Sequence, residues 1–348
     1  MTTGKTRRFR QHWRAILVVC LLGPLALLAV LLQWQPSLSR WESFLITEAP
    51  AAPLQVAWLG TATVLVTDGD NAIMTDGFFS RQSLMTLARG AIEPDLERIG
   101  EGLALAGVER LDAVVVLHSH YDHAMDAPEV ARRTGALLVG SESTANVGRG
   151  WNLPESALYV PAVGEVLRFG RFELELVPSA HVPMLPMVAR LTGHGETIDE
   201  PLVPPAPISA WKEGQSYALM LRHPQGNLLI QGSAGFVGGE LQGQMADIAL
   251  LSTGSLGRQS SDYQRRYFEE MVLTTGAHTV IPMHWDDFFT VLNQDTHPLG
   301  PLLDNFHGAM EGLKRHSQEH DRAFHMLRPL DRFSVENGRL QSEKPPAQ

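Results

Sequence analysis

The sequence predicts an α/β protein with one layered domain over residues 54–340. Short β-branched runs such as 113–117 alternate with segments of helical spacing such as 94–106, a pattern typical of α/β layers. Histidine or aspartate directly follows several of the strand-like runs, which places these side chains along one edge of the sheets. Hydrophobic residues make up 44% and charged residues 19% of the 348-residue chain, as in ordinary globular proteins.

The N-terminal segment precedes this domain. Residues 1–14 form a basic tip, and residues 15–34 contain an uncharged apolar stretch long enough to span a bilayer, flanked by Trp13 and Trp34. We expect a membrane anchor with a cytoplasmic N-terminus and an extracytoplasmic domain, periplasmic in a Gram-negative cell. A cleaved signal sequence and a buried core helix are the alternatives. Residues 35–53, rich in Pro, Ser and Ala, read as a linker.

Charge and cysteine content exclude some functions. Six of the 28 Lys and Arg residues precede Glu42, so the rest of the chain carries 22 basic and 38 acidic residues, a net charge of −16. Such an acidic body is a poor partner for nucleic acid. Cys20, the only cysteine, lies in the apolar segment, so a metal in the domain must be held by His, Asp or Glu.

The first half of the domain reads as a β-meander followed by alternating helices and strands. Asp76 closes the third run, Gly107 ends the helix predicted over 94–106, and Asp126 begins another helix as a cap rather than as a metal ligand. The last of these strands ends shortly before His181. The predicted strands are 56–60, 63–67, 72–75, 113–117, 136–139, 157–160, 165–169 and 172–177.

Residues 182–214 differ from their surroundings because they hold six prolines and show no clear periodicity. We expect a lid over a functional site, with a disordered surface insertion as the alternative. Strands are then predicted at 217–222, 227–231, 248–252 and 279–283, with a helix over 261–273 and His284 after the last strand. A helical region over 301–322 and a closing hairpin over 324–340 complete the chain.

The segment from His118 to His123, which reads His-Ser-His-Tyr-Asp-His, is the strongest chemical signal. In extended chain, His118 and His120 point to the same face and can hold one ion, while Asp122 and His123 can face a second. These ligands suit zinc, and manganese and iron are also compatible with them. The alternative is a solvated polar loop or a cluster of capping residues.

The spacing of this segment resembles the signature of the metallo-β-lactamase superfamily, with Asp76 before it and His181 and His284 after it. The resemblance implies a four-layer αβ/βα sandwich and one or two metal ions, usually zinc, that activate water for hydrolysis. It also implies ligand roles: His118, His120 and His181 for the first ion, and Asp122, His123 and His284 for the second. Asp76 resembles the buried aspartate that supports the histidine loop.

One position departs from the family pattern. Members with two ions usually carry a bridging aspartate in a turn that matches Gly232-Ser233-Ala234 here, so Ser233 stands in its place. We expect a filled first site and a partly occupied second site, unless a water, Asp286 or Asp287 replaces the missing carboxylate.

Among the branches of the superfamily, the body looks most like the group that contains N-acyl-phosphatidylethanolamine phospholipase D and the ascorbate-6-phosphate lactonases. It rests on Tyr121 in the motif, on the segment 178–181, and on the segment 280–284. Tyr121 and His194, the latter in the expected lid, are candidate substrate contacts.

The predicted function is a membrane-anchored, extracytoplasmic hydrolase. Metal-bound hydroxide, oriented or deprotonated by Asp122, would attack a phosphodiester, ester or lactone, including lipid-derived substrates. The expected partners are that small-molecule or lipid substrate and, through the N-terminal helix, a membrane. The alternatives are an iron-dependent oxidoreductase on the same fold and a non-catalytic metal-binding protein that lost the bridging aspartate. The oligomeric state stays open.

Overall fold

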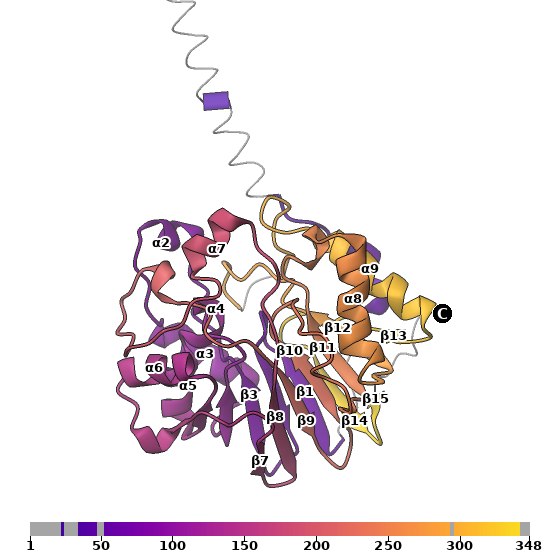
Figure 1. Cartoon of the computed structure of the whole chain (residues 1–348), viewed down its shortest axis with the longest axis horizontal. Helices are drawn as coiled ribbons and strands as arrows, with labels where there is room; N and C mark the ends of the chain where they lie inside the picture. The colour runs from indigo at the N-terminus through magenta and orange to yellow at the C-terminus, as the bar shows by residue number, and fades with distance from the viewer. Residues whose placement is uncertain (1–21, 24–33, 47–51, 293–295, 342–348) are drawn as a thin grey trace, which may run out of the picture.

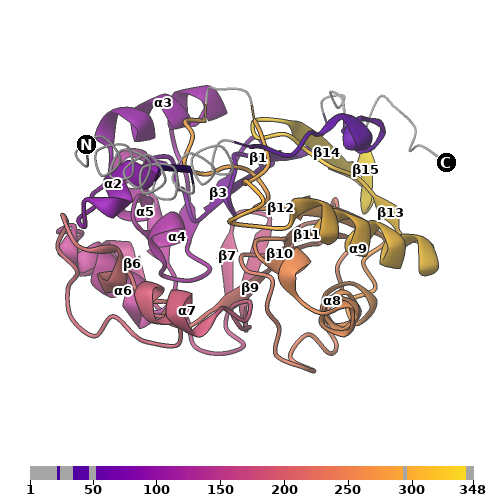
Figure 2. The same ribbon diagram turned by 90° about the horizontal axis from the view of Figure 1, so that it is seen from above.

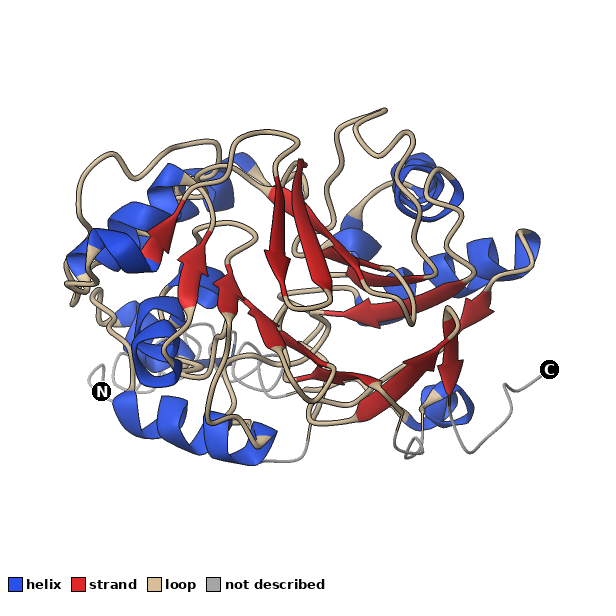
Figure 3. Cartoon of the chain, turned by 90° about the horizontal axis from the view of Figure 1, so that it is seen from below, coloured by secondary structure: helices blue, strands red, loops and turns tan. Residues whose placement is uncertain are grey.

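Two β-sheets form the centre of the protein, and helices flank both of them (Figures 1 and 3). The structure is a computed structural model that describes residues 22–23, 34–46, 52–292 and 296–341. Helices α3 (Leu96–Ala106), α5 (Ala127–Thr134) and α6 (Glu142–Gly150) lie on one side of the sheets (Figures 1 and 2). Helices α8 (Ser261–Phe268) and α9 (Phe306–Glu319) lie on the other side. This arrangement agrees with the predicted sandwich of two sheets.

The first sheet has eight strands in the order β15-β14-β1-β2-β3-β4-β5-β6. Pairing is antiparallel from β15 to β3 and parallel from β3 to β6, with Met74 of β3 opposite Val114 of β4. The strands are β1 (Leu54–Trp58), β2 (Val64–Thr67), β3 (Ala72–Thr75), β4 (Ala113–Val115), β5 (Leu137–Val139), β6 (Leu158–Tyr159), β14 (Arg332–Glu336) and β15 (Arg339–Gln341).

The second sheet has seven strands in the order β13-β12-β11-β10-β9-β8-β7. Pairing is parallel from β13 to β10 and antiparallel from β10 to β7, so β8, β10, β11 and β12 all end at one edge. The strands are β7 (Val166–Phe169), β8 (Phe172–Pro178), β9 (Tyr217–Arg222), β10 (Leu228–Gln231), β11 (Ile248–Ser252), β12 (Thr279–Met283) and β13 (Ala323–Phe324).

Buried apolar side chains hold the layers together. Trp58 of the first sheet packs against Trp285 after the second, with ring centroids 5.1 Å apart. Burial of such aromatic surface is a major source of folding free energy. The helices around these layers are α2 (Leu84–Ala88), α3 (Leu96–Ala106), α4 (Tyr121–Ala124), α5 (Ala127–Thr134), α6 (Glu142–Gly150), α7 (Pro186–Thr192), α8 (Ser261–Phe268) and α9 (Phe306–Glu319).

Local signals explain where the first helices begin and end. The carboxylate of Asp95 accepts backbone hydrogen bonds at the start of α3, and Gly107 adopts the left-handed conformation that ends it. Asp126 occupies the predicted N-cap position of α5, but its side chain does not cap the helix. Its carboxylate instead accepts the backbone N–H groups of Phe79 and Ser80, and burial raises its pKa to about 6.

Two segments differ from the prediction. Residues 182–214 contain helix α7 and a short 3₁₀ turn at Ile208–Ala210, where the sequence indicated an irregular insertion. Residues 324–340 do not form one hairpin, because β13 joins the second sheet while β14 and β15 pair in the first. The chain therefore crosses between the two sheets within a few residues.

The expected membrane anchor and extracytoplasmic location need correction. Among the residues that the structure describes, no helix is both long enough and apolar enough to cross a bilayer. Most of the predicted span, residues 15–21 and 24–33, lies outside the described residues. The location that was inferred from this span is therefore withdrawn.

Candidate metal centre

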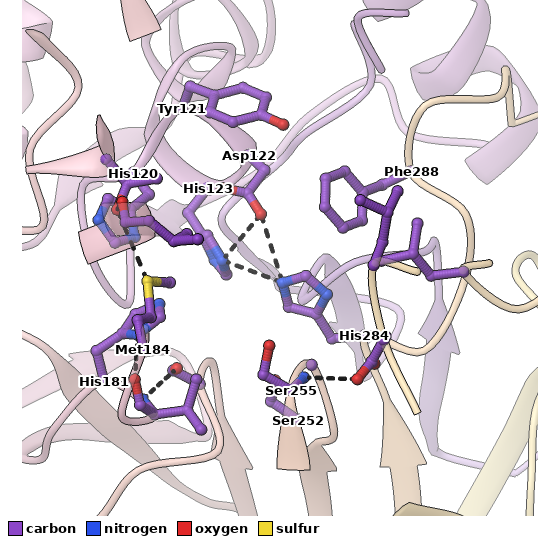
Figure 4. Close-up of a pocket in the computed structure, with 18 of the residues that line it drawn as sticks. His120, Tyr121, Asp122, His123, His181, Met184, Ser252, Ser255, His284 and Phe288 are labelled. Carbon is purple, nitrogen blue, oxygen red and sulfur yellow. Dashed lines mark hydrogen bonds and ion pairs between the residues drawn. The ribbon is translucent and has the colours of Figure 1, made fainter. Parts of the chain in front are cut away.

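Strand ends bring the predicted site residues together at one edge of the two sheets. Asp76 follows β3, the motif follows β4, and His181 and His284 follow β8 and β12 of the other sheet. The one-turn helix α4 begins directly after His120, so Asp122 lies on a helical turn beside the loop. Figure 4 shows these side chains converging from both sheets. The edge-of-sheet position predicted from the sequence is confirmed.

The first cluster consists of His118, His120 and His181, each of which offers a ring nitrogen within 4.8 Å of the other two. The Nε2 atoms of His118 and His120 are buried and have no hydrogen-bond partner within the described ranges. His181 donates Nδ1–H to the carbonyl of Val182 at 2.9 Å, which leaves its Nε2 free. Buried ring nitrogens without partners are costly unless they bind something. These two nitrogens, together with a ring nitrogen of His181, fit a divalent metal ion.

The second cluster adjoins the first. Oδ2 of Asp122 lies 3.7 Å from Nε2 of His123 and 3.5 Å from Nε2 of His284, and the two Nε2 atoms are 3.3 Å apart. Dashed lines in Figure 4 join these three side chains. The ring centroids of His118 and His123 are 3.7 Å apart, so the two clusters are in contact through these rings. Their imidazole and carboxylate donors suit a second divalent ion.

The carboxylate of Asp76 supports the second cluster from behind. Its Oδ2 accepts Nδ1–H of His123 at 2.7 Å, and its Oδ1 accepts the backbone N–H of Leu117 at 2.8 Å. Asp76 is fully buried and its backbone adopts a positive φ of 55°. Such a partner sets the tautomer of a ligating histidine and turns its Nε2 towards a metal. The structure therefore places Asp76 as the sequence predicted.

Burial keeps most of these imidazoles neutral, as metal binding requires. It lowers the pKa of His120 and of His181 to about 3, and it lowers the pKa of His118 well below its usual value. Burial opposes the charge of His123 too, but the carboxylates of Asp76 and Asp122 outweigh it and raise the pKa of this imidazole.

The pKa of the Asp122 carboxyl is lowered, whereas the pKa of a buried acid without such neighbours is raised. Burial acts to raise this pKa, but the neighbouring His123 and His284 together lower it well below its usual value. His284 itself adopts a positive φ of 59°, an unfavourable conformation for a non-glycine residue. Positive φ at both Asp76 and His284 indicates that backbone strain is tolerated to hold this geometry.

Ser233 lies at the cavity beside the two clusters, and its Oγ accepts the backbone N–H of Val182 at 3.1 Å. Neither of the aspartates suggested as replacements for the missing carboxylate reaches the site. Asp286 forms a buried ion pair with Arg81 and accepts the N–H of Thr61, and Asp287 accepts a hydrogen bond from Gln35. Neither Asp286 nor Asp287 belongs to the two clusters or lines the cavity in this structure.

The two candidate substrate contacts have different positions. Tyr121 lines the cavity and packs edge-on against Phe78, with ring centroids 6.0 Å apart. His194 does not line the cavity; its ring lies 5.3 Å from that of His181, and its Nδ1 lies 2.7 Å from a carboxylate oxygen of Glu213. His194 therefore packs behind a proposed ligand rather than facing the cavity.

Sequence reasoning missed several residues around the centre. Glu213 accepts hydrogen bonds from Gly195 N–H and the Ser216 hydroxyl, both at 2.8 Å, and no local pattern marked it. Ser252, Asp304 and Phe288 line the cavity. A positional signal existed for Ser252, because it ends β11 at the same edge as the histidines. Glu213 and Phe288 lie in segments without periodicity, and Asp304 lies at the start of the region predicted as helical.

A family model and two curated relatives match parts of the chain. The sequence model described as "Metallo-beta-lactamase superfamily" matches residues 56–240. The chain is 27% identical over 139 residues to a UPF0173 metal-dependent hydrolase of Myxococcus xanthus, which covers 39% of this chain and 43% of the relative. It is 29% identical over 129 residues to one of Methanopyrus kandleri, with 37% and 47% covered. The matches thus span less than half the length of these curated relatives.

Two solved structures of low sequence identity can be superposed on much of this chain. A possible metal-dependent hydrolase from Veillonella parvula has a TM-score of 0.48 at 13% identity, over 81% of this chain and 100% of that chain. CmlA, a diiron β-hydroxylase from Streptomyces venezuelae, also has a TM-score of 0.48, at 14% identity, over 83% of this chain and 55% of that chain.

Proposed function

Because the chain belongs to the metallo-beta-lactamase superfamily, we propose that it is a metal-dependent hydrolase. The observation that carries this proposal is the pair of adjoining clusters, His118, His120 and His181 on one side and Asp122, His123 and His284 on the other. The buried Nε2 atoms of His118 and His120 have no hydrogen-bond partner among the described residues, and an ion would satisfy both of them. A hydrolase of a phosphodiester, ester or lactone uses such a centre.

The chain's own residues have distinct tasks in the proposed mechanism. A bound divalent ion lowers the pKa of water towards neutrality and polarises the oxygen of the bond to be cleaved. The first cluster would hold this ion, and Asp76 would keep His123 turned towards a second ion. Asp122 lines the cavity, so its carboxylate can orient water or accept its proton.

We expect the two clusters to bind ions unequally. The first cluster offers three neutral imidazoles, whereas the position for a bridging carboxylate is occupied by the neutral Ser233. A hydroxyl supplies no negative charge to two neighbouring cations, so their mutual repulsion is less compensated. The first ion would be zinc, with manganese or iron compatible with the same ligands.

The finer placement beside N-acyl-phosphatidylethanolamine phospholipase D and the ascorbate-6-phosphate lactonases is also a proposal. Tyr121 at the cavity supports it, because the tyrosine of the motif is positioned to meet substrate. The substrate is likewise a proposal: a phosphodiester, ester or lactone, including a lipid-derived one.

The test combines metal content with hydrolysis. Purified chain would be assayed on bis(p-nitrophenyl) phosphate, p-nitrophenyl esters and a lactone, before and after chelation and metal replacement. We expect hydrolysis that is lost on chelation and is restored by zinc or another divalent ion. Activity that survives complete removal of metal, or its absence on all three substrate classes with metal bound, would reject the proposal.

A further inference from the structure

A cavity of about 280 Å³ opens beside the metal centre. Its size is near the lower end of the range for ligand sites, roughly 300–1,000 Å³. His120, Asp122, His123, His181 and His284 form one side of it, so a molecule in the cavity contacts the centre directly. The apolar lining residues are Leu87, Val182, Met184, Val188, Ile208, Trp211, Phe288, Phe289, Leu299 and Leu303.

The apolar wall reaches the metal ligands. The ring of Phe288 meets that of His284 edge-on, with centroids 5.5 Å apart, and Phe289 packs against Phe288 at 4.5 Å. Figure 4 shows Phe288 beside His284, above the serines. Helix α7 contributes Val188 to the same lining. A chain attached to the bond being cleaved would thus extend from the centre along apolar side chains.

The charges of the cavity disfavour an anionic substrate. No described residue that lines it is Lys or Arg, whereas two of the lining residues are Asp122 and Asp304. Recognition of a phosphate group commonly relies on arginine or lysine. A phosphodiester would depend on the metal ions alone to compensate its anionic oxygens and would have to place its second substituent against apolar side chains, whereas a neutral ester needs no cationic side chain.

A small polar floor lies between the apolar wall and the centre. Oγ of Ser252 is buried and has no hydrogen-bond partner among the described residues. Asp304 accepts the backbone N–H groups of Ser255 and Asn305, and burial raises the pKa of its carboxyl. A hydroxyl without a partner can donate to an uncharged carbonyl or ether oxygen.

We propose that this cavity binds the apolar acyl chain of a neutral carboxylic ester or lactone, with the scissile carbonyl at the metal centre and an ester oxygen near Ser252. This inference rests on the proposed hydrolase function and narrows its substrate class. Hydrolysis breaks the acyl carbon–oxygen bond, joins the oxygen of water to the acyl carbon, and delivers a proton to the leaving alcohol. In a lactone the acid and the alcohol remain in one molecule.

A chain-length series tests the acyl pocket. With the metal-loaded full chain, kcat/KM would be measured for p-nitrophenyl acetate, butyrate and octanoate and for bis(p-nitrophenyl) phosphate. Each methylene buried in an apolar site contributes about 0.8 kcal/mol, or up to about fourfold. We expect octanoate to exceed acetate by at least about tenfold and to exceed the phosphodiester. Equal rates for the esters, or preference for the phosphodiester, would overturn the inference.

Leu303 and Leu302 provide a matched pair of variants. Their exposures are 38% and 40%, but only Leu303 lines the cavity. We expect Leu303→Arg to reduce octanoate hydrolysis by about tenfold relative to bis(p-nitrophenyl) phosphate, because it places a cation at the wall. Leu302→Arg should leave both rates within about twofold. Equal effects of the two substitutions would contradict the acyl pocket.

Binding to metal-free protein separates this inference from the proposed function. Calorimetry with methyl heptyl ketone and methyl propyl ketone, neutral ligands that cannot be hydrolysed, measures the pocket without catalysis. We expect the heptyl ketone to bind at least about tenfold more tightly and Leu303→Arg to remove this difference. Absence of the difference overturns the acyl pocket even if the metal-loaded chain hydrolyses phosphodiesters. If the difference in ketone affinity is present but the metal-loaded chain hydrolyses no substrate, the acyl pocket is supported and the hydrolase function is rejected.

Discussion

Asp76 and His123 form a fully buried pair in which the carboxylate accepts Nδ1–H of the imidazole at 2.7 Å. The same carboxylate binds the backbone N–H of Leu117, the residue just before the histidine motif. One side chain from the end of β3 therefore fixes both the loop and the ring that faces the second cluster.

Asp76→Asn should weaken the second ion more than the first. The amide cannot replace the carboxylate as an anionic acceptor for both N–H groups, and loss of such support typically costs about 10- to 100-fold in metal affinity. Titration of metal-free protein would measure both affinities, with exposed Asp70→Asn as the control. Equal loss at both sites, or none at either, would show that Asp76 does not act through His123.

Ser233→Asp should tighten the second ion. A carboxylate at this position adds a negative charge between two cations, whereas Ser233→Ala changes no charge and should leave the second affinity within a few fold. Stepwise metal titration followed by elemental analysis distinguishes the two ions. If Ser233→Asp left the affinity ratio of the two sites unchanged, the residue would not occupy the bridging position.

Metal-free protein should lose stability as the pH falls below about 6.5. The folded-state pKa of His120 and of His181 is about 3, so the unfolded chain takes up protons that the folded chain cannot bind. Two such histidines lower the free energy of unfolding by about 2.7 kcal/mol per pH unit. His123, whose pKa is raised, contributes stability below pH 6.5 that disappears at higher pH, so it does not produce this slope.

Urea denaturation of metal-free protein at pH 7, 6 and 5 measures this effect. A His120→Ala, His181→Ala double variant should show a shallower decline, because it lacks the two groups. A free energy of unfolding that is constant over this range would mean that the buried imidazoles do accept protons in the folded chain.

Arg81→Met should destabilise the fold by about 3–5 kcal/mol, because it leaves the buried Asp286 carboxylate without its partner. The double variant Arg81→Met, Asp286→Leu should recover much of this loss. Metal stoichiometry of the folded double variant should equal that of the wild type, since Asp286 lies outside the cavity. Loss of an ion from this variant would indicate that Asp286 is a metal ligand.

The sequence predicted the centre better than its surroundings. His118, His181 and His284 could be placed because each follows a predicted strand, and parallel strands end at one edge. Helix α7 carried a signal as well, with Pro186 in its first turn and Gly193 at its C-cap, but the neighbouring prolines obscured it.

Other features depend on contacts distant in sequence. Pairing of β13 with β12 is decided by tertiary packing, so the short run at Ala323–Phe324 looked like part of a hairpin. Glu213 reaches His194 only after residues 182–214 fold against α6, and Asp304 meets Ser255 across 49 positions. No periodicity in sequence reports such contacts.

Metal content of the purified chain tests the central claim most directly. Elemental analysis would compare the wild type with the His118→Ala, His120→Ala double variant and with the Leu302→Arg variant. Hydrolysis by each protein would be measured before and after chelation. The account predicts one tightly bound ion per chain in the wild type and in Leu302→Arg, a second that dialysis removes, and neither tight binding nor hydrolysis in the histidine variant. Equal metal content and hydrolysis in the wild type and the histidine variant would contradict the metal centre.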